Sequence, residues 1–393
     1  MAGKIFNKKI FFIILFGFIL RMVFVLYLKP AFYFDDEHEY WKMVENFLQG
    51  RGLIVGENLK AYRPPLYPLF LVLFAKFGIG LKGIRISQCL ISTASIYLVY
   101  CLGKRIYNKK VGILAAGISS IYPFFIFYSG FLLTETLFVF LVAWCVLSFI
   151  KLTEKNVLPF YGFVSGGVCG LAGLCRPTME LFFPFCVLFV LCTKQEMKNK
   201  LKKMAFAIAG FILVLSMWVI RNYIVLGKFV PGTTMGGAVF WEGNNPYSQG
   251  GPCRYFPEGV WQIEESKRDA VFYSLTFDCI KKDPHRFTLL LWKKFIRFWN
   301  VVPNASEYSG TLYNVISVLS FGLLIPFFVL GMFVPVRNCK TGFLIGIIAF
   351  FTIFHMIFIA SIRYRIAIEP FVILFASAGF LWLVDSIKGK INI

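Results

Sequence analysis

Apolar stretches of about 17 to 25 residues recur along the whole chain, from residues 10 to 28 near its start to residues 366 to 385 near its end. As a helix, a stretch of this length crosses the roughly 30 Å hydrocarbon core of a bilayer. Shorter polar segments separate most of these stretches. The sequence therefore predicts an all-α polytopic membrane protein.

The composition agrees with a membrane protein. The 393 residues are 58% hydrophobic and 19% aromatic, and only 16% of them are charged, which is far from the balance of soluble domains. The net charge of +21 comes mainly from short basic clusters between apolar stretches, a pattern typical of membrane topology rather than of nucleic-acid binding. The first stretch follows a short basic leader without a small-residue cleavage site, so we expect it to be retained.

Most of the ten cysteines lie in apolar stretches, and they show neither CxxC nor Cys/His spacing. We expect them to act as small buried hydrophobic residues rather than as metal ligands. Cys253 and Cys279 share one long loop, where they are able to pair if the loop is extracytoplasmic.

Ten spans are predicted, near residues 10–28, 84–103, 111–128, 132–150, 158–175, 179–193, 204–220, 310–334, 342–360 and 366–385. One side of this arrangement receives the basic clusters, among them "KRIYNKK" and "KQEMKNKLKK". By the positive-inside rule that side is cytoplasmic, and both termini lie there. The apolar core of residues 63–80 is too short to span, so we expect a re-entrant or interfacial helix.

Two long regions then lie outside the cell, residues 29–83 and 221–309. We expect a transmembrane module over residues 1–220 that carries a catalytic first loop, a small extracytoplasmic region over 221–309, and C-terminal helices over 310–393. Residues 286–299 alternate apolar and basic clusters, as an interfacial helix does when Lys293, Lys294 and Arg297 face lipid head groups.

Five acidic residues crowd the thirteen residues of the stretch "YFDDEHEYWKMVE", which follows the first span. Helical spacing of the apolar residues after "DDE" predicts an interfacial amphipathic helix. Asp36 then lies at the N-cap with Glu39 three positions on, which favours a capping box without catalytic function. Alternatively, an ionised Asp36 beside the helix N-terminus is a competent general base, with Asp35 and Glu37 adding negative charge.

Glu135 lies near the external start of the fourth span, where an acid is either a functional residue or an ordinary first-turn residue. Five arginines lie at the same boundary, against the positive-inside bias. Snorkelling to lipid phosphates explains any one of them, whereas all five together favour a site for an anionic head group. They are Arg63, Arg176, Arg221, Arg363 and Arg365.

Three other features carry less information. Arg21, inside the first span, is expected to snorkel or to pair with a loop acid. His38 and His285 have no companion ligands at metal-site spacing. The glycine-rich residues 232–246 are expected to form a surface loop able to line a sugar site.

In order along the chain, several motifs resemble those of GT-C glycosyltransferases, in the branch of protein O-mannosyltransferases and lipid A aminoarabinose transferases. "DDEHEY" is similar to the Asp-Glu-x-x-Tyr motif of their first external loop, and "AYRPPLYP" is similar to their Arg-Pro-Pro-x-Tyr-Pro segment. Later landmarks are "LTETLF", "GLCRPT", "WVIRNY", "GNNP" and "RYRIAIEP".

This resemblance implies a GT-C bundle that uses a polyprenyl-phosphate-linked sugar on the external face. Transfer would go, with inversion, to a lipid, glycan or protein acceptor. Asp36 and Glu37 take the acidic positions of the motif, and Asp35 is an extra acid. The matched motifs add Tyr62 and Asn244 to the arginines as substrate-binding candidates, while the sugar, the acceptor and a divalent cation stay open. The alternative is a transporter or lipid flippase, although no internal repeat is evident.

Overall fold

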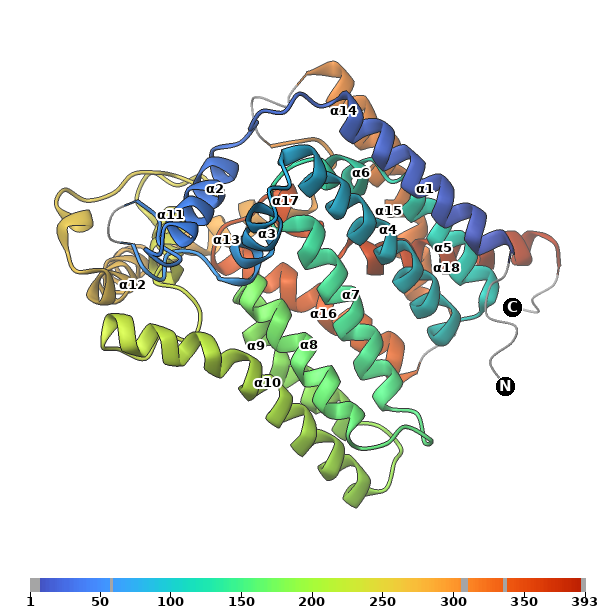
Figure 1. Ribbon diagram of the computed structural model, residues 1–393. Coiled ribbons are helices and arrows are strands. Elements are labelled where there is room, and N and C mark those ends of the chain that lie inside the picture. The colour runs from blue at the N-terminus through green and yellow to red at the C-terminus, as the bar shows by residue number, and fades with distance from the viewer. Residues whose placement is uncertain (1–7, 57–58, 305–309, 335–337, 390–393) are drawn as a thin grey trace.

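The computed structural model describes residues 8–56, 59–304, 310–334 and 338–389 (Figure 1). These residues are almost entirely helical; the extended pairing is one isolated bridge between Val55 and Leu59. Three basic residues on the predicted cytoplasmic side lie outside the described residues; they are Lys4, Arg337 and Lys390. The expected all-α class is confirmed.

Seven helices of the described residues are long and apolar enough to cross a bilayer. They are α1 (Lys8–Tyr27), α4 (Leu81–Ile106), α7 (Glu135–Leu152), α10 (Met197–Leu226), the span Thr311–Phe333 that contains α14 and α15, α16 (Cys339–Ile357) and α18 (Glu369–Ile387). An eighth span is formed if α5 (Lys109–Ile121) and α6 (Pro123–Ser129), bent by 53°, count together.

Two predicted spans are shorter than expected. α8 (Tyr161–Cys175) and α9 (Thr178–Leu191) have 15 and 14 residues, or about 22 and 21 Å of helix. All ten predicted segments are helical, but these two fall below the usual spanning length. The doubtful segment forms α3 (Leu66–Lys76), which has 11 residues and is short, as predicted.

Small residues set the closest helix contacts in the bundle. A Cβ added to Gly166 of α8 would lie 1.8 Å from the carbonyl oxygen of Ala207 in α10, and one added to Gly210 would lie 2.1 Å from that of Phe163. Gly331 of α15 and Gly379 of α18 meet in the same way. Because lipid tails are as apolar as the helices, such close backbone approach is a main source of attraction between spans.

Arg21 of α1 stabilises the bend between α5 and α6. Pro123 has no N–H, so the carbonyl of Ser119 loses its helical donor. The fully buried guanidinium of Arg21 donates to the carbonyls of Ser119 and Ser120 at 3.2 and 3.0 Å, and to Ser92 Oγ at 2.7 Å. The expected snorkelling or pairing with a loop acid is therefore wrong, because backbone carbonyls inside the bundle hold this cation.

Short helices and loops gather at one end of the bundle. They include α2 (Asp35–Leu48), α3, α11 (Gly236–Asn244), α12 (Glu265–Lys282), α13 (Pro284–Trp299) and α17 (Ile362–Arg365). In Figure 1 most of these lie toward the left, while the start of α1 and the end of α18 lie at the right. The two long regions predicted from the sequence thus form one polar assembly.

Buried polar contacts join the two regions of this assembly. The carboxylate of Glu265 accepts from the backbone N–H groups of Lys60 and Ala61 at 2.6 and 2.9 Å, and from Thr234 Oγ1 at 2.7 Å. Arg221 donates to the carbonyl of Lys60 at 2.6 Å. The first loop is therefore held against the second loop and the end of α10.

α13 has the predicted amphipathic character, with Leu289, Trp292 and Ile296 exposed along it. Its basic residues do not share one outward face. Lys294 is buried and donates to Asn244 Oδ1 at 2.8 Å and to the carbonyl of Ile357 at 3.0 Å. Burial and the nearby charge of Arg286 lower the pKa of Lys294 to about 7. The expectation that Lys294 faces head groups is wrong, since it satisfies the carbonyl at the end of α16.

Cys253 and Cys279 are both free thiols. The disulfide considered from the sequence is not formed in this structure.

The contact between α8 and α10 can be tested with one methyl group. Gly166→Ala should destabilise the protein by about 1–3 kcal/mol or more, because the added Cβ meets backbone that cannot move aside. Gly346→Ala, in α16, is the matched control, since nothing lies within 4 Å of its Cβ position. Thermal and chemical unfolding of the purified protein measures both; equal stability of the two variants would contradict this packing.

The side of the membrane on which the polar assembly lies stays a prediction. In a background with Cys192, Cys253, Cys279 and Cys339 changed to Ser, a membrane-impermeant maleimide should label Gln249→Cys in intact cells but not Asn156→Cys. Both positions are exposed at opposite ends of the bundle. The reverse pattern would place the assembly in the cytoplasm.

Candidate active site

The acidic stretch forms the start of α2. The helix begins at Asp35, so the third helical residue is Glu37, and its carboxylate accepts from the backbone N–H groups of Tyr33 and Phe34 at 2.6 and 3.1 Å. The capping box predicted for Asp36 and Glu39 is therefore wrong. Because the helix starts two residues earlier than expected, with Phe34 rather than Asp36 at the N-cap, Glu37 satisfies the backbone and Asp36 is left available for other contacts.

Glu37 also ties the first loop to the bundle. It is fully buried, and its other oxygen accepts from the N–H of Leu132 at 2.7 Å, just before α7. With at least three backbone donors on one carboxylate, this acid has a structural part to play. Asp35 is exposed on the opposite side of the same turn.

Arg363 joins two acids that are far apart in the sequence. Its Nη1 lies 2.5 Å from Asp36 Oδ2, and its Nε and Nη2 donate to the carboxylate of Glu135 at the start of α7. Ser361 caps α17, which presents Arg363 to both. The first loop, α7 and the segment before α18 therefore meet at one guanidinium.

Two more arginines extend this contact on either side. Arg63 lies 2.7 Å from Asp36 Oδ1 and also pairs with Glu39. Arg176, between α8 and α9, pairs with Glu135 at 2.6 Å and donates to Thr134 Oγ1. We call the six charged residues the ion-pair network; they are Asp36, Glu39, Arg63, Glu135, Arg176 and Arg363.

Three acids and three arginines balance the charge of the network, and its outer members remain partly open to solvent. The side chains of Asp36, Arg63 and Arg363 are 21%, 26% and 28% exposed, whereas Glu135 is 1% exposed. Burial opposes ionisation of Asp36, but the charges of Arg363 and Arg63 outweigh it and hold the pKa of Asp36 well below its usual range. Asp36 is therefore a carboxylate at any working pH.

Aromatic rings line the arginines of the network. Arg63 lies 5.4 Å from the ring centroid of Tyr62 and 5.5 Å from that of Tyr40. Arg176 lies 5.8 Å from the ring of Tyr364, which stacks on the buried His355. Such rings stabilise cations and fix their orientation. Tyr62 was predicted from the sequence, whereas Tyr364 was not, although it lies between the two arginines of "RYR".

Glu242 of α11 is a second residue that the sequence analysis missed. Burial raises its pKa, against the charges of Arg254 and Arg63. It lies near Arg63 of the ion-pair network but is not a partner in the ion pairs of that arginine. The expected surface loop over residues 232–246 is wrong, because residues 236–244 form the largely buried helix α11, which brings Glu242 near Arg63.

The structure does not bring three predicted candidates to the network. Arg365 is fully buried and pairs with Glu369 at 3.0 Å while donating to the carbonyl of Asn300. Because α17 is helical rather than extended, Arg363 and Arg365 do not project to one side as a fork. Arg221 holds the first loop, as described above, and the side chain of Asn244 bonds Lys294.

Comparisons with known proteins agree with the motifs. Residues 62–220 match the model of the dolichyl-phosphate-mannose-protein mannosyltransferase family. No curated protein matched the chain.

Solved structures give the fold. The archaeal oligosaccharyltransferase AglB from Archaeoglobus fulgidus, in complex with an inhibitory peptide and a dolichol-phosphate, is 14% identical to this chain with a TM-score of 0.63, and the match covers 98% of this chain and 52% of that one. Its apo form is 14% identical with a TM-score of 0.61 over the same shares. ArnT from Cupriavidus metallidurans bound to undecaprenyl phosphate is 14% identical with a TM-score of 0.49, over 96% and 62%.

This chain thus spans about half the length of the AglB structures that it matches. The shared fold with AglB confirms the expected fold, and the family match over residues 62–220 agrees with the resemblance to GT-C glycosyltransferases drawn from the motifs. Neither comparison assigns a reaction to particular residues of this chain.

The different surroundings of neighbouring acids predict different mutant behaviour. Glu37→Gln should destabilise the protein by about 1–3 kcal/mol, because its amide NH₂ group would face backbone N–H donors. Asp35→Asn, in the same turn but exposed, should leave stability within about 0.5 kcal/mol. Unfolding temperatures of the two variants measure the difference; a destabilised Asp35→Asn with an unaffected Glu37→Gln would contradict the geometry.

Proposed function

We propose that this chain transfers a sugar from a polyprenyl-phosphate-linked donor to an extracytoplasmic acceptor. The observation that carries the proposal is the ion-pair network, in which one partly exposed carboxylate is shared by two arginines at the polar end of a membrane bundle. The arginines suit a phosphate, and the carboxylate suits an acceptor proton. The lipid tail of the donor would lie beside the membrane-spanning helices.

Donor binding would rearrange the contacts of the network. A phosphate that reaches Arg63 and Arg363 competes with Asp36 for the same guanidinium groups, and both are partly exposed. As these arginines turn to the phosphate, at least one oxygen of Asp36 loses its partner and becomes free to accept a hydrogen bond. Arg176 and the buried Glu135 would keep Arg363 in place during this exchange.

The transfer itself is a single displacement. The acceptor hydroxyl donates its proton to Asp36 while its oxygen forms a bond to the anomeric carbon of the sugar. The bond from that carbon to the phosphate oxygen breaks, and the electron pair leaves with the polyprenyl phosphate. Arginines facing the phosphate stabilise this developing charge, and attack opposite the leaving group inverts the anomeric centre.

The segments predicted as separate regions would share this work. The first loop supplies the base, while Arg363 comes from the C-terminal part beyond residue 310. Residues 221–309 contribute Glu242 and α11 on the outer side, where the acceptor would enter. The positive-inside charge bias supports an assembly on the outer face of the cell membrane, with both termini in the cytoplasm.

Substitutions in the network should separate catalysis from donor binding. Asp36→Asn keeps the size of the side chain and should lower turnover by at least about 10²-fold, because an amide does not accept the acceptor's proton. Polyprenyl phosphate should still bind this variant. Arg363→Gln should instead weaken binding of polyprenyl phosphate by roughly 10-fold or more, because a charge-assisted contact is lost.

The measurements are transfer of radiolabel from a panel of polyprenyl-phosphate sugars into a membrane extract, and binding of polyprenyl phosphate to the purified chain. Arg51→Ala is the matched control, since it removes one positive charge from an exposed site of the same loop outside the network. Full transfer activity in Asp36→Asn and unchanged binding in Arg363→Gln, with normal folding, would refute the assignment. Movement of lipid without sugar transfer would favour the flippase alternative.

A further inference from the structure

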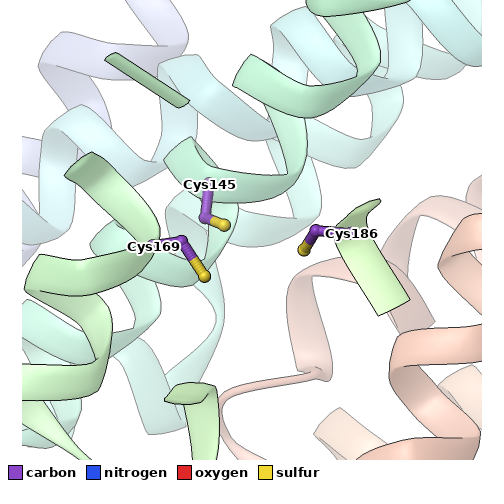
Figure 2. Close-up of side chains that lie close together, drawn as sticks. All are labelled: Cys145, Cys169 and Cys186. Carbon is purple, nitrogen blue, oxygen red and sulfur yellow. The ribbon is translucent and has the colours of Figure 1, made fainter. Parts of the chain in front are cut away.

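Three cysteines from three different helices converge inside the bundle (Figure 2). Cys145 lies in α7, Cys169 in α8 and Cys186 in α9, and each is fully buried. Their sulfur atoms all lie within 4.8 Å of one another. In the described part of the chain, no other three His, Cys, Asp or Glu side chains bring ligand atoms so close together.

We propose that Cys145, Cys169 and Cys186 bind a single soft metal ion, Cu(I), in a trigonal site. Thiolate sulfur selects Cu(I), Zn(II) and iron–sulfur clusters over hard cations. With metal–sulfur bonds of about 2.3 Å, three sulfurs around one ion lie roughly 4.0 Å apart. The observed triad therefore needs only small side-chain rotations to close around an ion.

The number of ligands favours Cu(I) over Zn(II). Structural zinc sites are almost always four-coordinate, and among the described residues no fourth Cys, His, Asp or Glu joins the triad. Each cysteine binds the metal as a thiolate, so Cu(I) displaces three thiol protons, with no change of oxidation state.

The surroundings are apolar on all sides. The triad belongs to the main hydrophobic core, together with Phe149, Phe182 and Val142. The one backbone contact recorded for these sulfurs in the described chain runs from Cys169 Sγ to the carbonyl of Met179 at 3.8 Å. Water is therefore kept from the sulfurs, which protects bound Cu(I) from oxidation and exchange.

Exposed sulfur lies near one end of the same helix. Cys192 ends α9, about 9 Å along its axis from Cys186, and Cys339 at the start of α16 donates to the carbonyl of Cys192 at 3.8 Å. Both residues are exposed, so two soft ligands are available to an ion at the surface.

A bound ion would fix the three helices that position Glu135 and Arg176 of the ion-pair network. Glu135 begins α7, and Arg176 lies between α8 and α9. These residues lie about 10–15 Å along the helices from the triad. A bound ion would therefore hold α7, α8 and α9 together below the Glu135–Arg176 pair.

The test uses the purified full-length chain under anaerobic conditions, with Cu(I) supplied in competition with a chromophoric Cu(I) chelator. With Cys192 and Cys339 changed to Ser to remove the exposed pair, the chain should retain one Cu(I), release three protons and unfold at a higher temperature than the copper-free protein. The affinity for Cu(I) should fall in each of Cys145→Ser, Cys169→Ser and Cys186→Ser. The loss should exceed the roughly 10- to 100-fold loss that follows when only a residue outside the ligand shell is removed. Cys89→Ser and Cys101→Ser, also buried but outside the triad, are the matched controls.

X-ray absorption of the copper-loaded chain in the same background should show three sulfur neighbours at about 2.3 Å. This measurement decides the matter if the serine variants fail to fold. Binding below one ion per chain, fewer than three sulfur neighbours, or equal binding by triad variants and controls would overturn the proposal. Retention of Zn(II) in place of Cu(I) would overturn the choice of ion. None of these results depends on glycosyl transfer.

Discussion

The ion pairs of Arg363 with Asp36 and Glu135 constrain the arrangement of this protein more than any other contact described here. A carboxylate as buried as Glu135 is strongly destabilising unless a cation lies beside it. Arg363 and Arg176 both fill that need, one from each side. For these charges to meet, the start of α7, the turn between α8 and α9, the first loop and α17 must all reach one place.

The short helices α8 and α9 make this meeting possible. Had each been long enough to cross the bilayer comfortably, the turn that carries Arg176 would lie beyond the level of Glu135. Glycines allow α8 to pack directly on α10, so the short helix is held firmly despite its length. The same pair, with α7, brings three cysteines together in the core, so that one bundle positions both the outer arginine and the inner sulfurs.

Cations in this protein follow two patterns. Arg21, Lys294 and Arg365 are buried and donate to backbone carbonyls freed where helices bend or end. The network arginines instead bind carboxylates and keep a face toward solvent. The distinction is functional as well as structural, because a cation committed to backbone carbonyls is not available to a substrate phosphate, whereas one that shares a carboxylate can exchange partners.

The sequence by itself determined the class of the protein, its apolar segments and most of the network candidates. Span length and charge clusters follow from bilayer thickness and topology, which act locally and can be read along the chain. The motifs pointed to Asp36, Glu135, Arg63, Arg176 and Arg363, and the structure brings all five together. Only the tertiary structure decided which acid caps α2, that Arg365 turns away to Glu369, that Glu242 lies near Arg63, and that three cysteines meet in the core. Those outcomes depend on where a helix begins and which side of it meets a neighbour, and one residue of shift rotates a side chain by about 100°.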